Sequence, residues 1–320
     1  MPYKLYIVVP CYNEQEVLPV SAPALLEKLN SFIAAGRVSP DSGILFVNDG
    51  SRDRTWEIIT RLHESEPRVH GISLAHNAGE QNAYLAGMFT AIEKADVVIT
   101  TDCDLQDDIN AMDDMLTEYE NGCEIVYGVR SRREKETAIH KSNAGTFYKL
   151  MKACGSELPP EHSQYRLMSK RAVEMLADYG EVNLFLPALV PTIGLKSATV
   201  FHLRTERAAG KTNYSVMKLI RLAIVAVTSF SAAPLLLITL FCALCGLLTL
   251  VSLIAMIVVS VRRGAFDIPL CTLTAVFFIG TGLAGGMRIL GEYLFKNYME
   301  SKHRPRYHIA ESTDDRKGCN

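Results

Sequence analysis

The chain has 320 residues, with 33 lysines and arginines against 35 aspartates and glutamates, which gives a formal net charge of -2. Because the chain has no overall positive field that would attract nucleic acid, we expect no nucleic-acid partner. Hydrophobic residues make up 48% of the chain and its mean hydropathy is +0.11. A soluble enzyme of this size rarely reaches a positive mean hydropathy, so part of the chain is expected to lie in a membrane.

The first half of the chain alternates short β-rich runs with helical patterns. The β-rich runs are 5–10, 44–47, 69–74, 97–101 and 125–129, and the helical patterns are 55–63, 81–94 and 111–119. This alternation predicts an α/β fold with a doubly wound, mostly parallel sheet. In such sheets ligands bind beyond the carboxyl ends of the strands, so the residues that follow each run are the candidates for chemistry.

Polar segments with acidic residues follow three of these runs. They are PCYNE after the first run, NDGSRD after the second and DCDLQD after the fourth. Taken singly, Asp49-Gly50 is typical of a turn and Asp53 of a helix cap. Asp102 and Asp104 leave a buried strand on the same side, where they repel each other unless one is protonated or a cation lies between them. Since Mg²⁺ or Mn²⁺ typically binds one or two carboxylates together with phosphate oxygens, the pair predicts a metal-bound diphosphate ligand.

Two long runs without a charged residue follow the α/β part. The first run, 235–261, is 27 residues long, and the second, 268–287, is 20 residues long. Each is long enough to cross a hydrocarbon core of about 30 Å as a helix. The short segment 262–267 predicts that they form a hairpin. Residues 216–231 are either an amphipathic helix at the membrane interface or the last helix of the globular part.

Lysines and arginines flank the predicted hairpin unevenly. Seven lie outside it, against Arg262 and Arg263 in its loop: Lys211, Lys218, Arg221, Lys296, Lys302, Arg304 and Arg306. The positive-inside rule then predicts a multi-pass protein of the cell membrane with the catalytic domain and both termini in the cytoplasm. The predicted order is an α/β domain (1–215), an interfacial helix (216–231), two spans near 235–261 and 268–290 within 232–295, and a tail (296–320).

Taken together and in order, the motifs resemble the inverting GT-A glycosyltransferases of family 2. Within that family they are similar to the polyprenyl-phosphate glycosyltransferases, which include bactoprenol glucosyltransferases and dolichol-phosphate mannosyltransferase. The resemblance covers nearly the whole chain and is carried by VVPCYNE (8–14), VNDGSRDRT (47–55), HNAGEQNAYLAG (76–87), DCDLQDD (102–108), VYGVRSRRE (126–134), YRLMSKRAVEML (165–176), EVNLFL (181–186) and TSFS (228–231).

The resemblance implies a Rossmann-like GT-A domain followed by the membrane hairpin. It implies an enzyme that transfers a hexose, with inversion, from a nucleotide sugar to a polyprenyl phosphate such as undecaprenyl phosphate, in the making of a cell-wall or surface glycan. A UDP-sugar is favoured over a GDP-sugar as the donor, and a homo-oligomer is compatible with the resemblance.

The resemblance also implies roles for individual residues. The nucleotide-binding set is Pro10, Tyr12, Glu14, Asp49 and Asp102. The set for Mg²⁺ or Mn²⁺ and the diphosphate is Asp102, Asp104 and Gln106, and the catalytic set is Asp104, Arg166 and Gln164. Arg130 and Arg132 are candidates for contact with the acceptor phosphate, or they belong to a solvated basic loop.

Three positions depart from the family pattern. Gln164 stands where the family usually has Asp, Glu80 where relatives often have His, and Pro187 where Arg is usual. An amide cannot take a proton, so a sugar hydroxyl acceptor would lack its general base. A phosphate monoester has a second pKa of about 6 and arrives ionised, so Gln164 favours a lipid phosphate acceptor.

Two alternatives to this enzyme stay open. One is a non-catalytic or impaired relative that acts as a membrane scaffold, which the three departures motivate. The other is a family 2 polysaccharide synthase, although the single tryptophan, Trp56, lies in no QxxRW motif.

Overall fold

The computed structural model describes residues 2–130, 162–180, 186–203, 254, 268–302 and 304–315. The chain divides into two compact units. The first, called the sheet unit here, comprises Met1–Lys152, Glu157–Tyr214 and Arg304–Asn320, and the second comprises Ala153–Ser156 and Ser215–His303.

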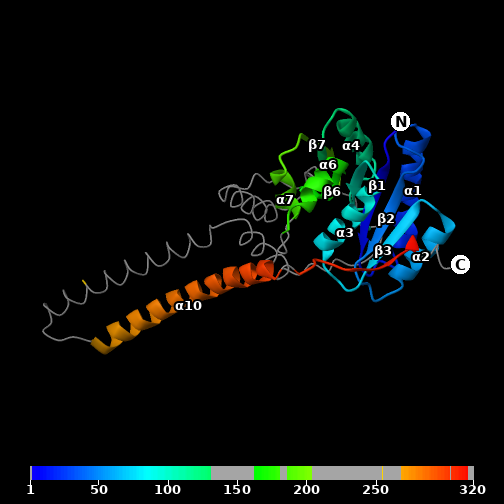
Figure 1. The fold of residues 1–320 in the computed structure, drawn as a ribbon. Coiled ribbons are helices and arrows are strands. Elements are labelled where there is room, and N and C mark those ends of the chain that lie inside the picture. Colours follow the sequence, from blue (N-terminus) through cyan, green and yellow to red (C-terminus); the bar gives the residue numbers. More distant parts are fainter. Residues whose placement is uncertain are drawn as a thin grey trace. The chain divides into compact units, whose positions relative to one another are not determined.

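The sheet unit is built on a sheet whose described strands follow the order β7-β5-β6-β4-β1-β2-β3-β8 (Figure 1). Their bounds are β1 Leu5–Cys11, β2 Gly43–Asn48, β3 Val69–Leu74, β4 Val97–Thr100, β5 Ile125–Arg130, β6 His162–Ser169, β7 Ser197–His202 and β8 Ile309–Ser312. β1 pairs in parallel with β2 and β4, β2 with β3, and β5 with β7. β6 runs antiparallel between β4 and β5, and β8 runs antiparallel to β3. The prediction of an α/β fold with a mostly parallel sheet is confirmed.

Helices cover both faces of this sheet. Their bounds are α1 Leu18–Ala34, α2 Thr55–Ser65, α3 Glu80–Ile92, α4 Ala111–Glu120, α6 Lys170–Ala177 and α7 Leu186–Thr192. One core joins α1, α2 and α4 to one face, and a second core joins α3, α6 and α7 to the other. β1 shows why both faces are filled, since Leu5, Ile7 and Val9 enter the first core while Tyr6 and Val8 enter the second. Alternate side chains of a strand point to opposite faces, so a strand buried on both faces has a continuous apolar run.

The C-terminal segment of the described chain adds an edge strand that the sequence pattern did not predict. β8 pairs with β3 through Ile72 opposite Ser312 and Ser73 opposite Glu311. Trp56 Nε1 donates to Glu311 Oε2 at 3.2 Å. Thr313 is buried beyond the end of the strand, where its backbone N–H donates to the carbonyl of Gly71 at 2.9 Å. The segment is therefore part of the sheet unit, held by backbone and side-chain hydrogen bonds.

The predicted localisation in the cell membrane is wrong. α10, Ile268–Ser301, is a helix of 34 residues that contains the second charge-free run. In the part of the chain that the structure describes, no helix is both long and apolar enough to cross a membrane. Charged residues follow the run within the same helix, from Arg288 onward. The other predicted span, 235–261, and the predicted interfacial helix, 216–231, lie outside the described residues apart from Ile254.

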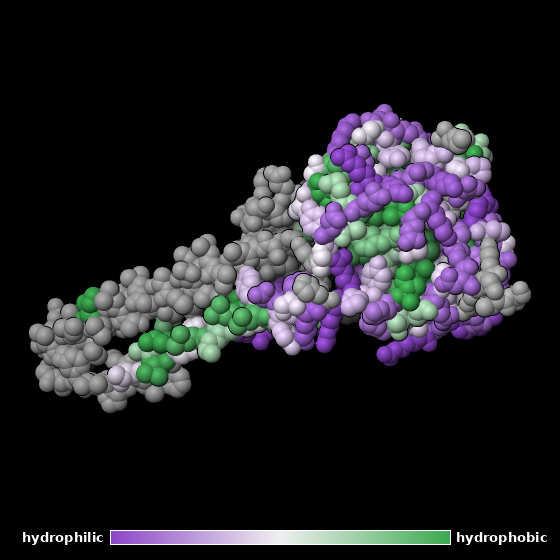
Figure 2. All heavy atoms as spheres, viewed as in Figure 1, coloured by the Kyte–Doolittle hydropathy of each residue, from purple (hydrophilic) through white to green (hydrophobic). Residues whose placement is uncertain are grey.

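α10 exposes large apolar side chains. Val276, Leu283 and Leu290 recur at seven-residue spacing and are exposed, as are Met287 and Leu294. Figure 2 shows apolar atoms gathered along the described part of this helix. Positions three, four and seven apart share one face of a helix, so α10 has an apolar face.

Candidate functional site

The polar segments after β1, β2 and β4 meet at one edge of the sheet. β1 lies between β2 and β4 and is parallel to both, with Cys11 opposite Asn48 and Val8 opposite Thr100. The residues that follow these three strands therefore leave the sheet side by side, at the edge where α/β sheets bind ligands.

Hydrogen bonds join the loop after β1 to the loop after β2. Asn13 lies in the left-handed region (φ 57°), its backbone N–H donates to Ser51 Oγ at 3.0 Å, and its Oδ1 accepts from the backbone N–H of Arg52 at 2.9 Å. The backbone N–H of Glu14 donates to Thr55 Oγ1 at 2.9 Å. The PCYNE segment is thus fixed on the loop after β2, and Tyr12 within it keeps an exposed ring.

Asp49 joins the loop after β2 to the start of α3. Its buried carboxylate accepts from the backbone N–H groups of Ala78 at 2.7 Å and Gly79 at 3.1 Å. Burial raises the pKa of Asp49, and these two N–H groups oppose the rise. Gly50 follows in the left-handed region (φ 63°), where a Cβ would lie 2.5 Å from the backbone nitrogen of Asn77. Only glycine permits this close approach, so the Asp49-Gly50 turn sets the path of residues 76–79 into α3.

Asp102 and Asp104 form the acidic centre of the site. Asp102 follows β4, and its Oδ1 accepts from the hydroxyl of Tyr84 in α3 at 2.5 Å. Asp104 is buried and accepts from the backbone N–H of Gln106 at 3.1 Å across a turn in which Leu105 has φ 53°. Burial raises the pKa of the Asp102 carboxyl, and the charges of Asp107 and Asp104 add to the rise. Tyr84 was not among the predicted site residues, although it lies in the HNAGEQNAYLAG motif.

This donor set fits a hard divalent cation. The two carboxylates and the side-chain amide oxygen of Gln106 are the ligand types that Mg²⁺ and Mn²⁺ prefer. Repulsion between the carboxylates contributes to the raised pKa of Asp102, and a bound cation would relieve it. Asp102, Asp104 and Gln106 could therefore hold such an ion.

Arg166 contributes a buried positive charge on β6, the strand next to β4. It lies in β6 opposite Thr100 of β4 and Tyr127 of β5, and its side chain is fully buried. Its Nη2 donates to Gln164 Oε1 at 2.6 Å. Burial lowers the pKa of Arg166 to about 10, so it stays protonated at neutral pH. Gln164 is therefore a neutral hydrogen-bond partner of this charge.

Asp107, a further carboxylate of the DCDLQDD loop, contacts two basic side chains. Arg130 donates through Nε to buried Asp107 Oδ1 at 3.0 Å, and His202 Nε2 lies 3.8 Å from the same oxygen. Tyr165 packs edge-on to His202 with ring centroids 5.2 Å apart, and its hydroxyl donates to the carbonyl of Asp108 at 3.0 Å. Asp107 was not predicted as a partner of Arg130, although the two residues lie in the DCDLQDD and VYGVRSRRE motifs. The other candidate for the acceptor phosphate, Arg132, lies outside the described residues.

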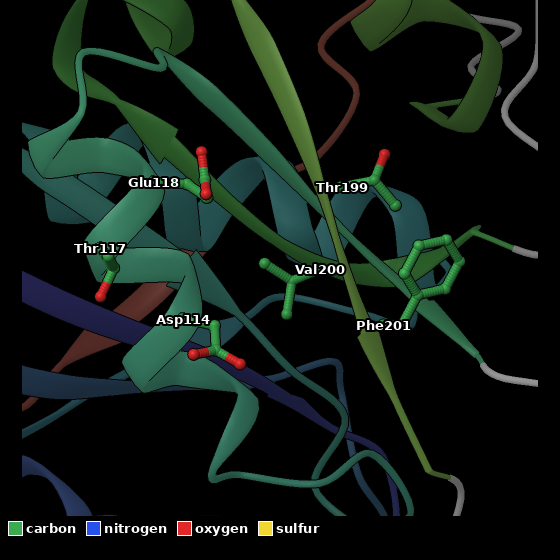
Figure 3. A pocket seen from close by; sticks show the side chains of 6 residues that line it. All are labelled: Asp114, Thr117, Glu118, Thr199, Val200 and Phe201. Atoms are coloured by element: carbon green, nitrogen blue, oxygen red, sulfur yellow. The ribbon is translucent and has the colours of Figure 1, made fainter.

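A pocket of about 260 Å³ lies elsewhere in the sheet unit, between α4 and β7. Figure 3 shows its lining, which is Asp114, Thr117, Glu118, Thr199, Val200 and Phe201. None of these is a predicted site residue. We therefore place the candidate functional site at the acidic centre and not at this pocket.

Residues 6–176, more than half of the chain, match the protein family described as "Glycosyl transferase family 2". The chain belongs to glycosyltransferase family 2. It is 41% identical over 305 residues to the "Uncharacterized glycosyltransferase YkoT" of Bacillus subtilis (strain 168), which covers 95% of this chain and 90% of that protein. It is 32% identical over 310 residues to the "Prophage bactoprenol glucosyl transferase homolog" of Escherichia coli (strain K12), with 96% and 98% covered. The "Bactoprenol glucosyl transferase" of Shigella phage SfV is also 32% identical, over 313 residues, with 96% and 98% covered.

The predicted family and the predicted enzyme class are confirmed by these matches. The protein is a family 2 glycosyltransferase with a GT-A-like fold. The family match includes the loops that follow β1, β2 and β4, together with Arg166 in β6.

Proposed function

We propose that this glycosyltransferase transfers a hexose, with inversion, from a nucleotide sugar to a polyprenyl phosphate such as undecaprenyl phosphate. The observation that carries the proposal is that two carboxylates, Asp102 and Asp104, follow β4, while buried Arg166 on the neighbouring strand β6 donates to the amide of Gln164. Similarity to proteins named bactoprenol glucosyl transferases supports a lipid phosphate as the acceptor. A UDP-sugar is the favoured donor.

The donor binds across the loops at the carboxyl ends of the strands. Pro10, Tyr12, Glu14 and Asp49 contact its nucleoside, and the exposed ring of Tyr12 offers a stacking surface. Asp102, Asp104 and Gln106 hold Mg²⁺ or Mn²⁺, which when bound supplies Lewis-acid neutralisation of the diphosphate.

Arg166 stabilises the negative charge that grows on the leaving diphosphate. A guanidinium can contact two phosphate oxygens at once, and in a buried site its interaction with charge is strong. The hydrogen bond from Arg166 Nη2 to Gln164 Oε1 fixes the direction of the guanidinium. Tyr84 does the same for Asp102 by donating to its Oδ1.

The acceptor needs no general base. The attacking oxygen of a phosphate monoester is ionised at neutral pH, and it displaces the diphosphate through a state with oxocarbenium character. A single displacement inverts the anomeric carbon. Gln164 therefore orients Arg166 and removes no proton. Arg130, held near this site by Asp107, contacts the acceptor phosphate.

The test is a transfer assay with the purified full-length chain, Mn²⁺ and undecaprenyl phosphate. Radiolabelled UDP- and GDP-hexoses are offered one at a time, and label is measured in the organic phase. We expect label from at least one donor, none with Asp104→Asn, and undiminished label with Asp114→Asn, which changes an exposed carboxylate outside the site. If no donor labels the lipid although the chain binds UDP or GDP, the scaffold alternative replaces this proposal.

A further inference from the structure

Three metal-ligand side chains come together at the opposite ends of the strands from the acidic centre. His63 lies in the last turn of α2, His70 is the second residue of β3, and Asp314 follows β8. One ligand atom from each lies within 4.8 Å of the other two. His63 and His70 are seven residues apart, whereas Asp314 is 244 residues from His70 and joins them because β8 pairs with β3.

His63 presents a nitrogen that is ready for a ligand. Its Nδ1 lies 2.5 Å from the carbonyl oxygen of Val69. A carbonyl can only accept, so Nδ1 carries the proton and Nε2 carries the lone pair. His63 is only 8% exposed, and Nε2 is buried without a hydrogen-bond partner among the described residues. A buried polar atom without a partner is costly, and an Nδ1–H bonded to a carbonyl is how metal-binding histidines are oriented.

His70 and Asp314 supply the other two donors. His70 Nδ1 lies 2.8 Å from Asp314 Oδ1, and its Nε2 lies 3.3 Å from the hydroxyl of Tyr6. A metal ion between Nδ1 and Oδ1 would take the place of the proton there. The ring of His70 then carries its proton on Nε2 and donates it to the hydroxyl oxygen of Tyr6. His70 therefore stays neutral and changes only its tautomer. Lys94 Nζ donates to the other oxygen, Oδ2, at 2.6 Å and holds the carboxylate in place.

We propose that His63, His70 and Asp314 bind a divalent transition-metal ion of the Zn²⁺ class. Two imidazole nitrogens and one carboxylate suit Zn²⁺ and not the hard ions expected at Asp102 and Asp104. Water completes the coordination. The ion joins α2, β3 and the segment after β8, and so it fastens the C-terminal strand to the sheet.

The test uses metal-free full-length chain in an Asp102→Asn/Asp104→Asn background, which removes the carboxylate site. Co²⁺ is the probe, because its visible absorption reports nitrogen and oxygen ligands in a tetrahedral field. We expect one equivalent to bind with visible bands that Zn²⁺ abolishes. Absence of these bands in the background protein would overturn the proposal.

Three further substitutions in that background locate the site. His63→Gln and Asp314→Asn should each weaken Co²⁺ binding more than about tenfold, because even outer partners of metal ligands contribute 10 to 100-fold. His308→Gln, an exposed histidine on the same C-terminal segment, is the control and should bind as the background does. Circular dichroism checks that each variant is folded, and Zn²⁺ should raise the Tm only in the background and the control. Equal Co²⁺ affinity in all four proteins would refute the assignment.

Discussion

The two ends of the parallel strands carry different chemistry. At the carboxyl ends, Asp102 and Asp104 offer oxygens after β4, and the neighbouring strand β6 carries the buried guanidinium of Arg166. At the amino end of β3, His63 and His70 offer imidazole nitrogens with one carboxylate. Oxygen donors with a guanidinium suit a hard ion and a diphosphate, whereas imidazoles suit a borderline metal. We therefore expect changes to the polar side chains of the acidic centre to alter sugar transfer, and changes to the amino-end ligands to alter stability.

The largest effect is expected at Asp104. Asp104→Ala should lower transfer at least about 10²-fold, because metal stabilisation of transition-state charge is worth several kcal/mol and about 1.4 kcal/mol is tenfold. Initial rates of label transfer measure the loss. Excess EDTA should do the same to the unmodified protein, and full activity in EDTA would contradict this role. Asp114→Asn is the matched control.

Gly50 tests how the turn after β2 shapes the same site. Gly50→Ala should destabilise the fold by about 2 to 5 kcal/mol, because the left-handed strain adds to overlap with the backbone of residues 76 and 77. Gly36→Ala is the matched control, since its φ is 70° with no atom within 4 Å of an added Cβ. It should cost only the strain, about 1 to 2 kcal/mol. Equal costs in urea unfolding would show that the close approach at Gly50 is unimportant.

The carboxyl-end site could be predicted because its residues lie in contiguous motifs directly after β-rich runs. The alternation of β-rich and helical runs predicted a mostly parallel sheet, and parallel strands bring their carboxyl ends to one edge. Tyr84 and Asp107 were missed because their partners, Asp102 and Arg130, are separated from them by 18 and 23 residues and by a helix or strand.

The amino-end site could not be predicted in this way. Asp314 is 244 residues from His70, and only the pairing of β8 with β3 brings them together. The predicted membrane localisation was wrong: it was based on runs without charged residues, whereas the described part of the chain has no helix both long and apolar enough to cross a membrane.

Substitution of Gln164 tests whether sugar transfer needs a general base at this position. Gln164→Asp would introduce a carboxylate near the guanidinium of Arg166. The rate of transfer to undecaprenyl phosphate near pH 7.5 should change less than about tenfold. Below pH about 6 the rates of both forms should fall together, because the acceptor phosphate then becomes protonated. Gln164→Asn controls for the shorter side chain. A gain of a hundredfold or more in the aspartate form would mean that the natural chain is an impaired enzyme.

The smallest effect is expected at Asp314, measured without metal. Burial raises the pKa of its carboxyl, but hydrogen bonds from Lys94 and His70 outweigh this and lower it to about 2 from 3.8. A lowered folded-state pKa stabilises the fold above about pH 4, and the gain is lost as the pH falls toward 2. Since the carboxylate is about one-third exposed, solvent screening reduces the gain to about 1 kcal/mol. Asp314→Asn should lose this amount at pH 7 in EDTA and almost nothing near pH 2, and an equal loss at both values would contradict the ion pairing.

The central claim is that the acidic centre holds a nucleoside diphosphate through a divalent ion, and calorimetric titration of the full-length chain with UDP and with GDP tests it directly. In Mn²⁺ we predict one binding site for at least one of the two nucleotides. Replacing Mn²⁺ with EDTA, or Asp104 with Asn, should weaken that binding more than about tenfold, while Asp114→Asn and His63→Gln leave it unchanged. Nucleotide binding of equal strength in Mn²⁺ and in EDTA would contradict the account.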